Sequence, residues 1–164
     1  MKKNIYLITL ISILIVVFGC SDNNSIPPVA STPPPDLIDV PEQIVIDETE
    51  ITMSSYLWRD FMPTIPEYED GQKLAAVIEM ETVDNSDFPG GLIIEKLWLF
   101  NKDEVWETTF SESGQSNKTS RIIKSARGGP RWDIGSEVVV VVQIIDNDQI
   151  YYLKETGVEI YRTD

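Results

Sequence analysis

A single cysteine, Cys20, sets the first limit on what this chain of 164 residues can fold into. With one thiol, no disulfide can form within the folded part, so the domain must be stable through its apolar core alone. The chain also contains no histidine. Catalytic sets of the Ser-His-Asp or Cys-His type are therefore excluded, as are the usual zinc and copper ligand sets.

Cys20 stands directly after an N-terminal apolar run. Lys2 and Lys3 precede an uncharged stretch over residues 5–18, which is short for a bilayer span and typical of a signal peptide. With Gly19 before the cysteine, the pattern resembles the lipobox of bacterial lipoproteins. The resemblance implies a signal peptide over residues 1–19 and acyl chains on Cys20 that anchor the chain to a membrane. An uncleaved transmembrane anchor is the alternative.

The two residues after the cysteine bear on location. Ser21 is not the aspartate associated with inner-membrane retention in some Gram-negative bacteria. Ser21-Asp22 partly resembles the acidic surface-export signal of Bacteroidota lipoproteins. We expect the outer membrane, and leave open whether the domain lies on the periplasmic or the surface side.

The charge of the chain excludes one class of partner. Asp and Glu number 27 against 13 Lys and Arg, for a net charge of −14. Nucleic-acid binding needs a basic patch that neutralises phosphates, so no nucleic-acid partner is expected. The acidity keeps a surface protein soluble, or else attracts cations or a basic partner.

Residues 20–50 have the composition of a lipidated cysteine followed by a spacer. Six of the ten prolines lie within fifteen residues here, at Pro27, Pro28, Pro33, Pro34, Pro35 and Pro41. Proline favours extended polyproline II, so this stretch predicts a semi-rigid linker. A single domain is expected over residues 51–164.

Short runs rich in Val, Ile, Thr and aromatic residues follow, separated by Gly, Pro, Asn and Asp, and this alternation predicts an all-β domain. Seven strands at this spacing favour an immunoglobulin-like β-sandwich of about seven strands. The predicted strands are Ile51–Phe61, Lys73–Val83, Leu92–Phe100, Val105–Phe110, Arg121–Ala126, Glu137–Asp146 and Gln149–Tyr161, the last broken at Gly157. Hairpin turns are predicted at Asn101–Asp103 and at Asn147-Asp148.

One face of the last hairpin is a candidate binding surface. Val139, Val141 and Tyr152 share a face with polar Glu137 and Gln143, which suggests that this face meets solvent. Contiguous exposed apolar side chains mark a partner site or a covering segment. The alternative is that both faces of the hairpin are buried.

A resemblance to a protein class rests on three motifs: Trp132-Asp133-Ile134-Gly135 before the final hairpin, Leu57–Phe61, and Asp103–Glu107. Together they are similar to small Bacteroidota-type lipoproteins with an immunoglobulin-like or fibronectin-III-like domain and no assigned activity. The resemblance implies the sandwich fold and no particular function.

The remaining chemistry is carboxylates and tryptophans. Asp84–Asp87 and Asp146–Asp148 carry oxygen ligands of the kind that calcium binds, but Asp and Asn are also the preferred turn residues, so turns are expected and no metal or cofactor is predicted. Glu79 and Glu81 lie too close on one strand for a glycosidase pair. Core positions are favoured for all four tryptophans, Trp58, Trp98, Trp106 and Trp132, with Trp58 and Trp132 the better candidates for exposure.

These observations predict a lipid-anchored, non-catalytic binding or scaffold module of the cell envelope, with a protein or a glycan as its partner. The first alternative is a carbohydrate-binding surface lipoprotein, which exposed tryptophans would favour. A carboxylate-dependent hydrolase is the second, and a pocket with two facing carboxylates would favour it.

Overall fold

A computed structural model describes residues 29–30, 35–63, 70–114 and 118–164. The signal peptide and Cys20 lie outside these ranges. The elements of the described part are β1 (Val29–Ala30), α1 (Pro35–Ile38), β2 (Gln43–Ile46), β3 (Thr49–Asp60), β4 (Ala75–Thr82), β5 (Ile93–Asn101), β6 (Glu104–Thr109), β7 (Glu112–Gly114), β8 (Arg121–Arg127), β9 (Glu137–Asp146) and β10 (Gln149–Thr163).

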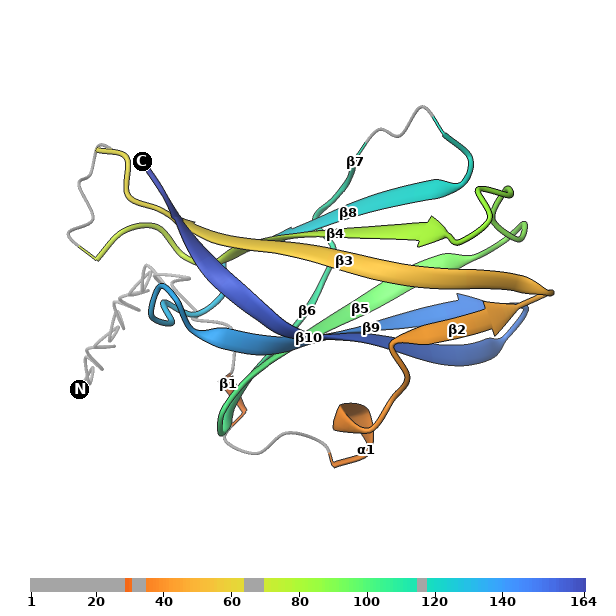
Figure 1. The fold of residues 1–164 in the computed structure, drawn as a ribbon. Helices are drawn as coiled ribbons and strands as arrows, with labels where there is room; N and C mark the ends of the chain where they lie inside the picture. Colours follow the sequence, from red (N-terminus) through yellow and green to blue (C-terminus); the bar gives the residue numbers. More distant parts are fainter. Residues whose placement is uncertain (1–28, 31–34, 64–69, 115–117) are drawn as a thin grey trace, which may run out of the picture.

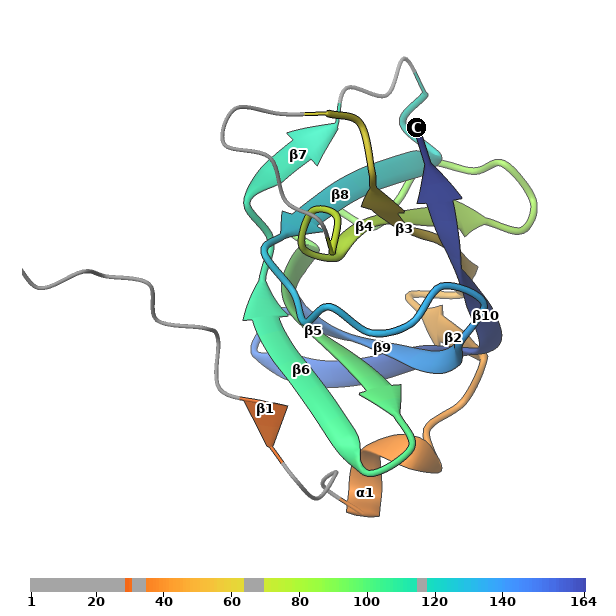
Figure 2. The same cartoon turned by 90° about the vertical axis from the view of Figure 1, so that its left-hand side faces the viewer.

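The all-β prediction is confirmed. Each of the seven predicted strands is present, as β3, β4, β5, β6, β8, β9 and β10, and β9 has the predicted bounds. The three further strands of the described part are short, at two to four residues each. The strands curl into two facing walls around one core. Figure 2 shows this sandwich-like arrangement end-on.

One wall, the β5 wall, contains β1, β6, β5, β9 and the first part of β10. The other, the β3 wall, contains β7, β8, β4, β3 and β2. The last strand joins them, because β10 runs antiparallel to β9 from Gln149 and parallel to β3 from Ile160. Figure 1 shows this strand crossing from one wall to the other. The predicted break at Gly157 is a bulge between Glu155 and Val158, with Gly157 at a φ of 68°, and the strand continues through it.

On the opposite side of the molecule the chain passes between the walls after β6. The Ser111 N–H donates to the Ser125 carbonyl of β8 at 2.9 Å, and β7 then pairs with β8. The space between the walls is filled by a core cluster of aliphatic side chains and two tryptophans, Trp106 and Trp132. The apolar core therefore lies inside the curl. Its burial stabilises a domain that has no disulfide bond.

Three hairpins turn on two residues each. Asn101 pairs with Glu104 and Asp146 with Gln149, which confirms both predicted turns. The third turn, Asp47-Glu48, joins β2 to β3 with φ values of 47° and 65°. Positive φ at both central positions is the geometry of a type I′ turn, which matches the twist of the strands on either side.

The third hairpin corrects the predicted end of the linker. Residues up to 50 were expected to be spacer, but β2 pairs with β3 and places Ile44 and Ile46 in the core cluster. Leu37 in α1 is also buried. The folded part therefore begins upstream of Ile51, because burial alternates along β2 even though prolines precede it.

The described part of β3 changes partner along one edge. It pairs with β2 up to Thr52 and with β10 from Leu57, so residues 53–56 have no strand beside them there. Glu155 lies against Ser55 in this gap, and Glu155 Oε2 and Ser55 Oγ are buried with no completed hydrogen bond in the described part. Burial raises the pKa of Glu155, while the hydroxyl and N–H of Ser55 act in the opposite direction.

Candidate functional site

The predicted apolar strip lies beneath a segment of the chain itself. Val141 is completely buried, and Val139 and Tyr152 are half-buried. All three belong to a second apolar cluster, outside the β5 wall, that Leu37 and Val40 cover. The expectation that this face is exposed is thus wrong for Val141, while the alternative, burial of both hairpin faces, holds only for the part of the face around Val141 and Gln143. A role of these residues in partner binding stays a prediction.

Beyond α1 the same face is open. A row of three isoleucines crosses the sheet here: Ile145 of β9 pairs with Ile93 of β5 and with Ile150 of β10. The side chains of Ile93 and Ile150 are more than half exposed. Ile93 also lines a pocket of about 350 Å³, at the small end for ligand sites. The pocket is lined by Ile93, Ile94, Glu95, Thr109, Phe110, Ser111 and Lys124. Its lining holds one carboxylate, whereas a glycosidase mechanism needs two.

Three of the four tryptophans are core residues, as expected. Trp98 and Trp132 are buried, Trp106 is completely so, and Trp132 Nε1 donates to Glu104. The core prediction is wrong for Trp58, which is half-buried on the outer face of β3. Trp132 does not join it there, so the exposed pair of tryptophans that would favour sugar binding is not formed.

Trp58 instead belongs to an aromatic row that the sequence did not reveal. Tyr56 stacks on Trp58 with ring centroids 5.4 Å apart and an interplanar angle of 27°, and on Tyr161 at 5.4 Å and 15°. Tyr56 is 46% exposed and Tyr161 is 44% exposed. Such offset stacking adds about 0.5–1.5 kcal/mol per pair beyond the area buried.

Two features of the sheet bring the row together. Tyr56 and Trp58 alternate with inward-facing Leu57 on β3, so they share the outer face. Tyr161 reaches them because β10 pairs with β3 in parallel, with Tyr161 beside Trp58. The only sequence signal for the row was the Tyr-Leu-Trp alternation in β3.

A cation completes the row. Ala75 pairs with Trp58 on one side and with Arg127 on the other, and the guanidinium carbon of Arg127 lies 5.8 Å from the Trp58 ring centroid. Arg127 is exposed and makes no ion pair with the residues that the structure describes. In a strongly acidic chain, this places a positive charge beside the Trp58 ring of the row.

A buried arginine holds the end of β3 beneath the row. The guanidinium of Arg59 donates to the carbonyl oxygens of Gln72 at 3.1 Å and Trp132 at 3.0 Å, and also to that of Asp70. Burial lowers the pKa of Arg59, and the nearby Arg131 acts in the same direction. The Arg59 guanidinium also donates to the Arg131 carbonyl at 3.5 Å, and because an arginine stays charged in proteins, this group fixes four loop carbonyls to β3.

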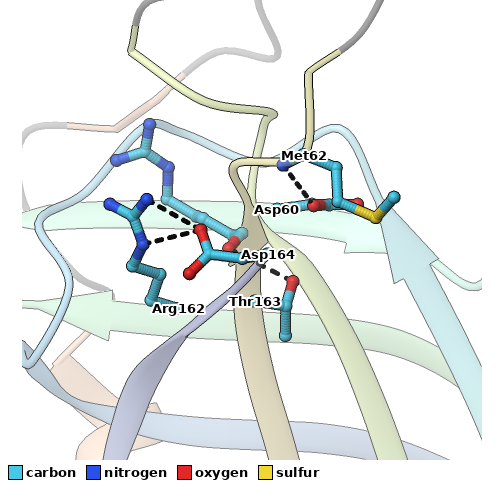
Figure 3. Close-up of polar contacts among 6 residues, drawn as sticks. Asp60, Met62, Arg162, Thr163 and Asp164 are labelled. Carbon is cyan, nitrogen blue, oxygen red and sulfur yellow. Dashed lines mark hydrogen bonds and ion pairs between the residues drawn. The ribbon is translucent and has the colours of Figure 1, made fainter.

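The ends of β3 and β10 are tied together next to the row. Thr163 Oγ1 donates to the Arg59 carbonyl at 3.5 Å. The Arg162 guanidinium lies 2.7 Å from an Asp164 carboxylate oxygen, an ion pair that Figure 3 shows. The Phe61 ring lies 5.2 Å from the guanidinium carbon of Arg59 and 4.3 Å from that of Arg162. The aromatic row therefore lies on two paired strands, β3 and β10, whose ends are held together by these contacts.

The acidic loops have the local structure of turns. Asp84 Oδ1 accepts the Ser86 N–H at 2.9 Å, and hydrogen bonds from Ser86 lower the pKa of Asp84. Within the described ranges, no group of three or more acidic, cysteine or histidine side chains could hold a metal ion. No helix in the part of the chain that the structure describes has the length and apolarity of a membrane span.

Comparison with known proteins adds no relative. No protein-family model matches the chain, and no curated protein matches it significantly.

Proposed function

We propose that this chain is a lipid-anchored, non-catalytic binding or scaffold module of the cell envelope, and that the aromatic row is its contact surface. The observation that carries the proposal is the exposed stack of Tyr56, Trp58 and Tyr161 with Arg127 beside it. Tyr, Trp and Arg are the residues enriched at the energetic centres of protein interfaces.

The position of the row supports this role. It lies on a sheet rather than on a loop, so its side chains are held in place before a partner arrives. Pre-positioned aromatic rings lose little side-chain entropy on binding, which leaves more of the contact energy for affinity. A tyrosine hydroxyl at each of two rings adds hydrogen-bonding capacity at the edge of an apolar surface.

Anchoring in the outer membrane through Cys20 is part of the proposal, supported by the pattern Lys2-Lys3, apolar run, Gly19, Cys20. The non-catalytic role is supported by the absence of histidine from the sequence and by the single carboxylate in the pocket lining. Cys20→Ser should release any processed protein from membranes. Unchanged membrane retention with normal processing in this variant would remove the lipoprotein part of the proposal.

A carbohydrate-binding role is the second candidate, because aromatic rings on the outer face of a sheet are also found where sugars bind. Sugar stacking needs a free ring face. The central ring, Tyr56, is stacked on both neighbours, and Arg127 lies over Trp58. This occupation of ring faces favours a protein partner, which can contact ring edges and hydroxyl groups.

The test compares two double variants of the mature chain. Tyr56→Ser with Tyr161→Ser removes the two most exposed rings of the row, and Ile93→Ser with Ile150→Ser is a matched control on the other wall, with similarly exposed side chains. We expect both to fold, since all four side chains are exposed, with the row variant the less stable of the two because it loses both ring stacks. Only the first should lose partners captured from envelope extracts.

If the row variant folds and keeps every captured partner, the aromatic row is not the contact surface. A glycan array separates the second candidate. Glycan binding that the row variant loses would establish the carbohydrate-binding role instead.

A further inference from the structure

The segment expected to be a free linker is docked on the domain. We name β1 and residues 35–42 the strap. Its first part pairs with the edge of the β5 wall, Val29 with Trp106 and Ala30 with Val105. Its second part places Leu37 in the outer apolar cluster beside Trp98 and Val141.

Hydrogen bonds to β10 fix the second part of the strap. Lys154 Nζ donates to the Ile38 carbonyl at 2.7 Å, and the Lys154 N–H donates to the Pro41 carbonyl at 2.9 Å. Thr156 Oγ1 donates to Glu42 at 2.9 Å. These contacts use backbone as well as side-chain groups, so the strap is joined to the sheet along its length.

The strap and the aromatic row lie on opposite sides of the molecule. In the order of the sheet, β1 is followed by β6, β5, β9 and β10 before β3 is reached. Figure 2 shows β1 and α1 below the β5 wall, with β3, β4 and β8 across the opposite side. The row is on the outer face of that opposite side.

From this arrangement we infer that the strap sets the orientation of the domain on its membrane, with the aromatic row turned away from the anchoring bilayer and available to a protein beyond it. The inference rests on the proposed anchor at Cys20. In this orientation the aromatic row contacts a protein and does not contact the lipid surface, although Trp and Tyr are also common at membrane interfaces.

Chain length supports the orientation. Cys20 is nine residues before Val29, and nine residues span at most about 30 Å when fully extended. A domain of about 130 residues is about 36 Å across. With β1 docked, the connection from Cys20 to Val29 is too short at full extension to let the opposite face turn over and reach the bilayer. A free linker reaching to residue 50 would allow it.

The experiment measures the distance of each side from a bilayer. Mature chain beginning at Cys20 is coupled through that thiol to a maleimide phospholipid in phosphatidylcholine vesicles that carry a headgroup energy-transfer acceptor. A donor dye is placed through an azide-bearing amino acid at one of two exposed positions. Asp103 lies in the β5–β6 turn near β1, and Ser54 lies two residues before Tyr56 on the row face.

We expect strong transfer from position 103 and little from position 54. A control chain carries a thirty-residue Gly-Ser insertion between Pro28 and Val29, which lengthens the tether and leaves the domain unchanged. In this chain the difference between the two positions should be lost.

Equal transfer from both positions of the uninserted chain, or stronger transfer from position 54, would overturn the inference. Because the lipid is attached chemically, the result does not depend on lipidation in the cell, which the Cys20→Ser variant tests separately. Loss of partner capture by the row variant is likewise a separate outcome.

Discussion

Gly129 is the position where one added methyl group should be most costly. A Cβ atom there would lie 2.8 Å from Cε3 and Cζ3 of Trp106 and 3.0 Å from the Leu74 Cβ. The backbone has little freedom to retreat, because the Gly129 N–H donates to the Leu74 carbonyl at 3.0 Å. Trp106 is completely buried, so the ring has no space in which to move.

The size of the effect follows from two opposing terms. Overpacking a filled core costs about 1–3 kcal/mol. Replacing glycine by alanine also restricts the unfolded chain, which returns about 0.4–1 kcal/mol. We therefore expect Gly129→Ala to lower the free energy of unfolding by about 1–2 kcal/mol, out of the 5–15 kcal/mol typical of a domain.

Urea unfolding followed by tryptophan fluorescence measures this change. The control is Gly90→Ala, where a Cβ meets nothing within 4 Å and φ is not positive, and which should be neutral or slightly stabilising. In a Trp106→Phe background the cost of Gly129→Ala should shrink, since the outer ring atoms are removed. Equal midpoints for Gly129→Ala and Gly90→Ala would refute the packing described at this position.

Three further predictions concern other parts of the fold. Trp98→Ala, which empties the centre of the outer apolar cluster, should cost about 3–5 kcal/mol in urea unfolding, and a small change would contradict the burial of Trp98. Because burial raises the pKa of Glu155 in the folded state, its contribution to stability is present below the unfolded pKa and lost as pH rises through the folded pKa. Glu155→Gln should therefore gain stability relative to wild type as pH increases from 4 to 7, and a constant difference would contradict this. Glu48→Gly, at a φ of 65°, should stabilise the domain by about 0.5–1 kcal/mol in thermal unfolding, because glycine tolerates the left-handed region; destabilisation would contradict the type I′ turn.

The strands could be predicted because local chemistry specifies them. Asn147-Asp148 lies between two β-prone runs, and both the turn and its strands were found. The β2–β3 hairpin was missed because its turn residues are Asp47 and Glu48, and glutamate is not a residue that signals a turn. Tertiary packing of Ile44 and Ile46 stabilises this hairpin, and no local pattern reports that packing.

The candidate site was harder to predict, because it depends on contacts between distant segments. Val141 was expected on an exposed face because Gln143 shares that face, but Leu37, about one hundred positions earlier, covers it. Tyr161 joins Tyr56 and Trp58 only through the parallel pairing of β10 with β3. Arg59 also faces inward from β3, so the polar and apolar residues of this strand do not divide cleanly between its two faces.

The crossing of β10 between the walls has a kinetic consequence. Its pairing with β3 joins Ile160 to Leu57, so the contact that closes the domain links residues about one hundred positions apart. Pairings of such long range are slow to form, because the intervening chain must be ordered first. Local hairpins such as β5–β6 can form early, whereas closure waits for a fifteen-residue strand at the end of the chain. A chain emerging from its N-terminus therefore stays open until β10 has emerged, and only then acquires the aromatic row.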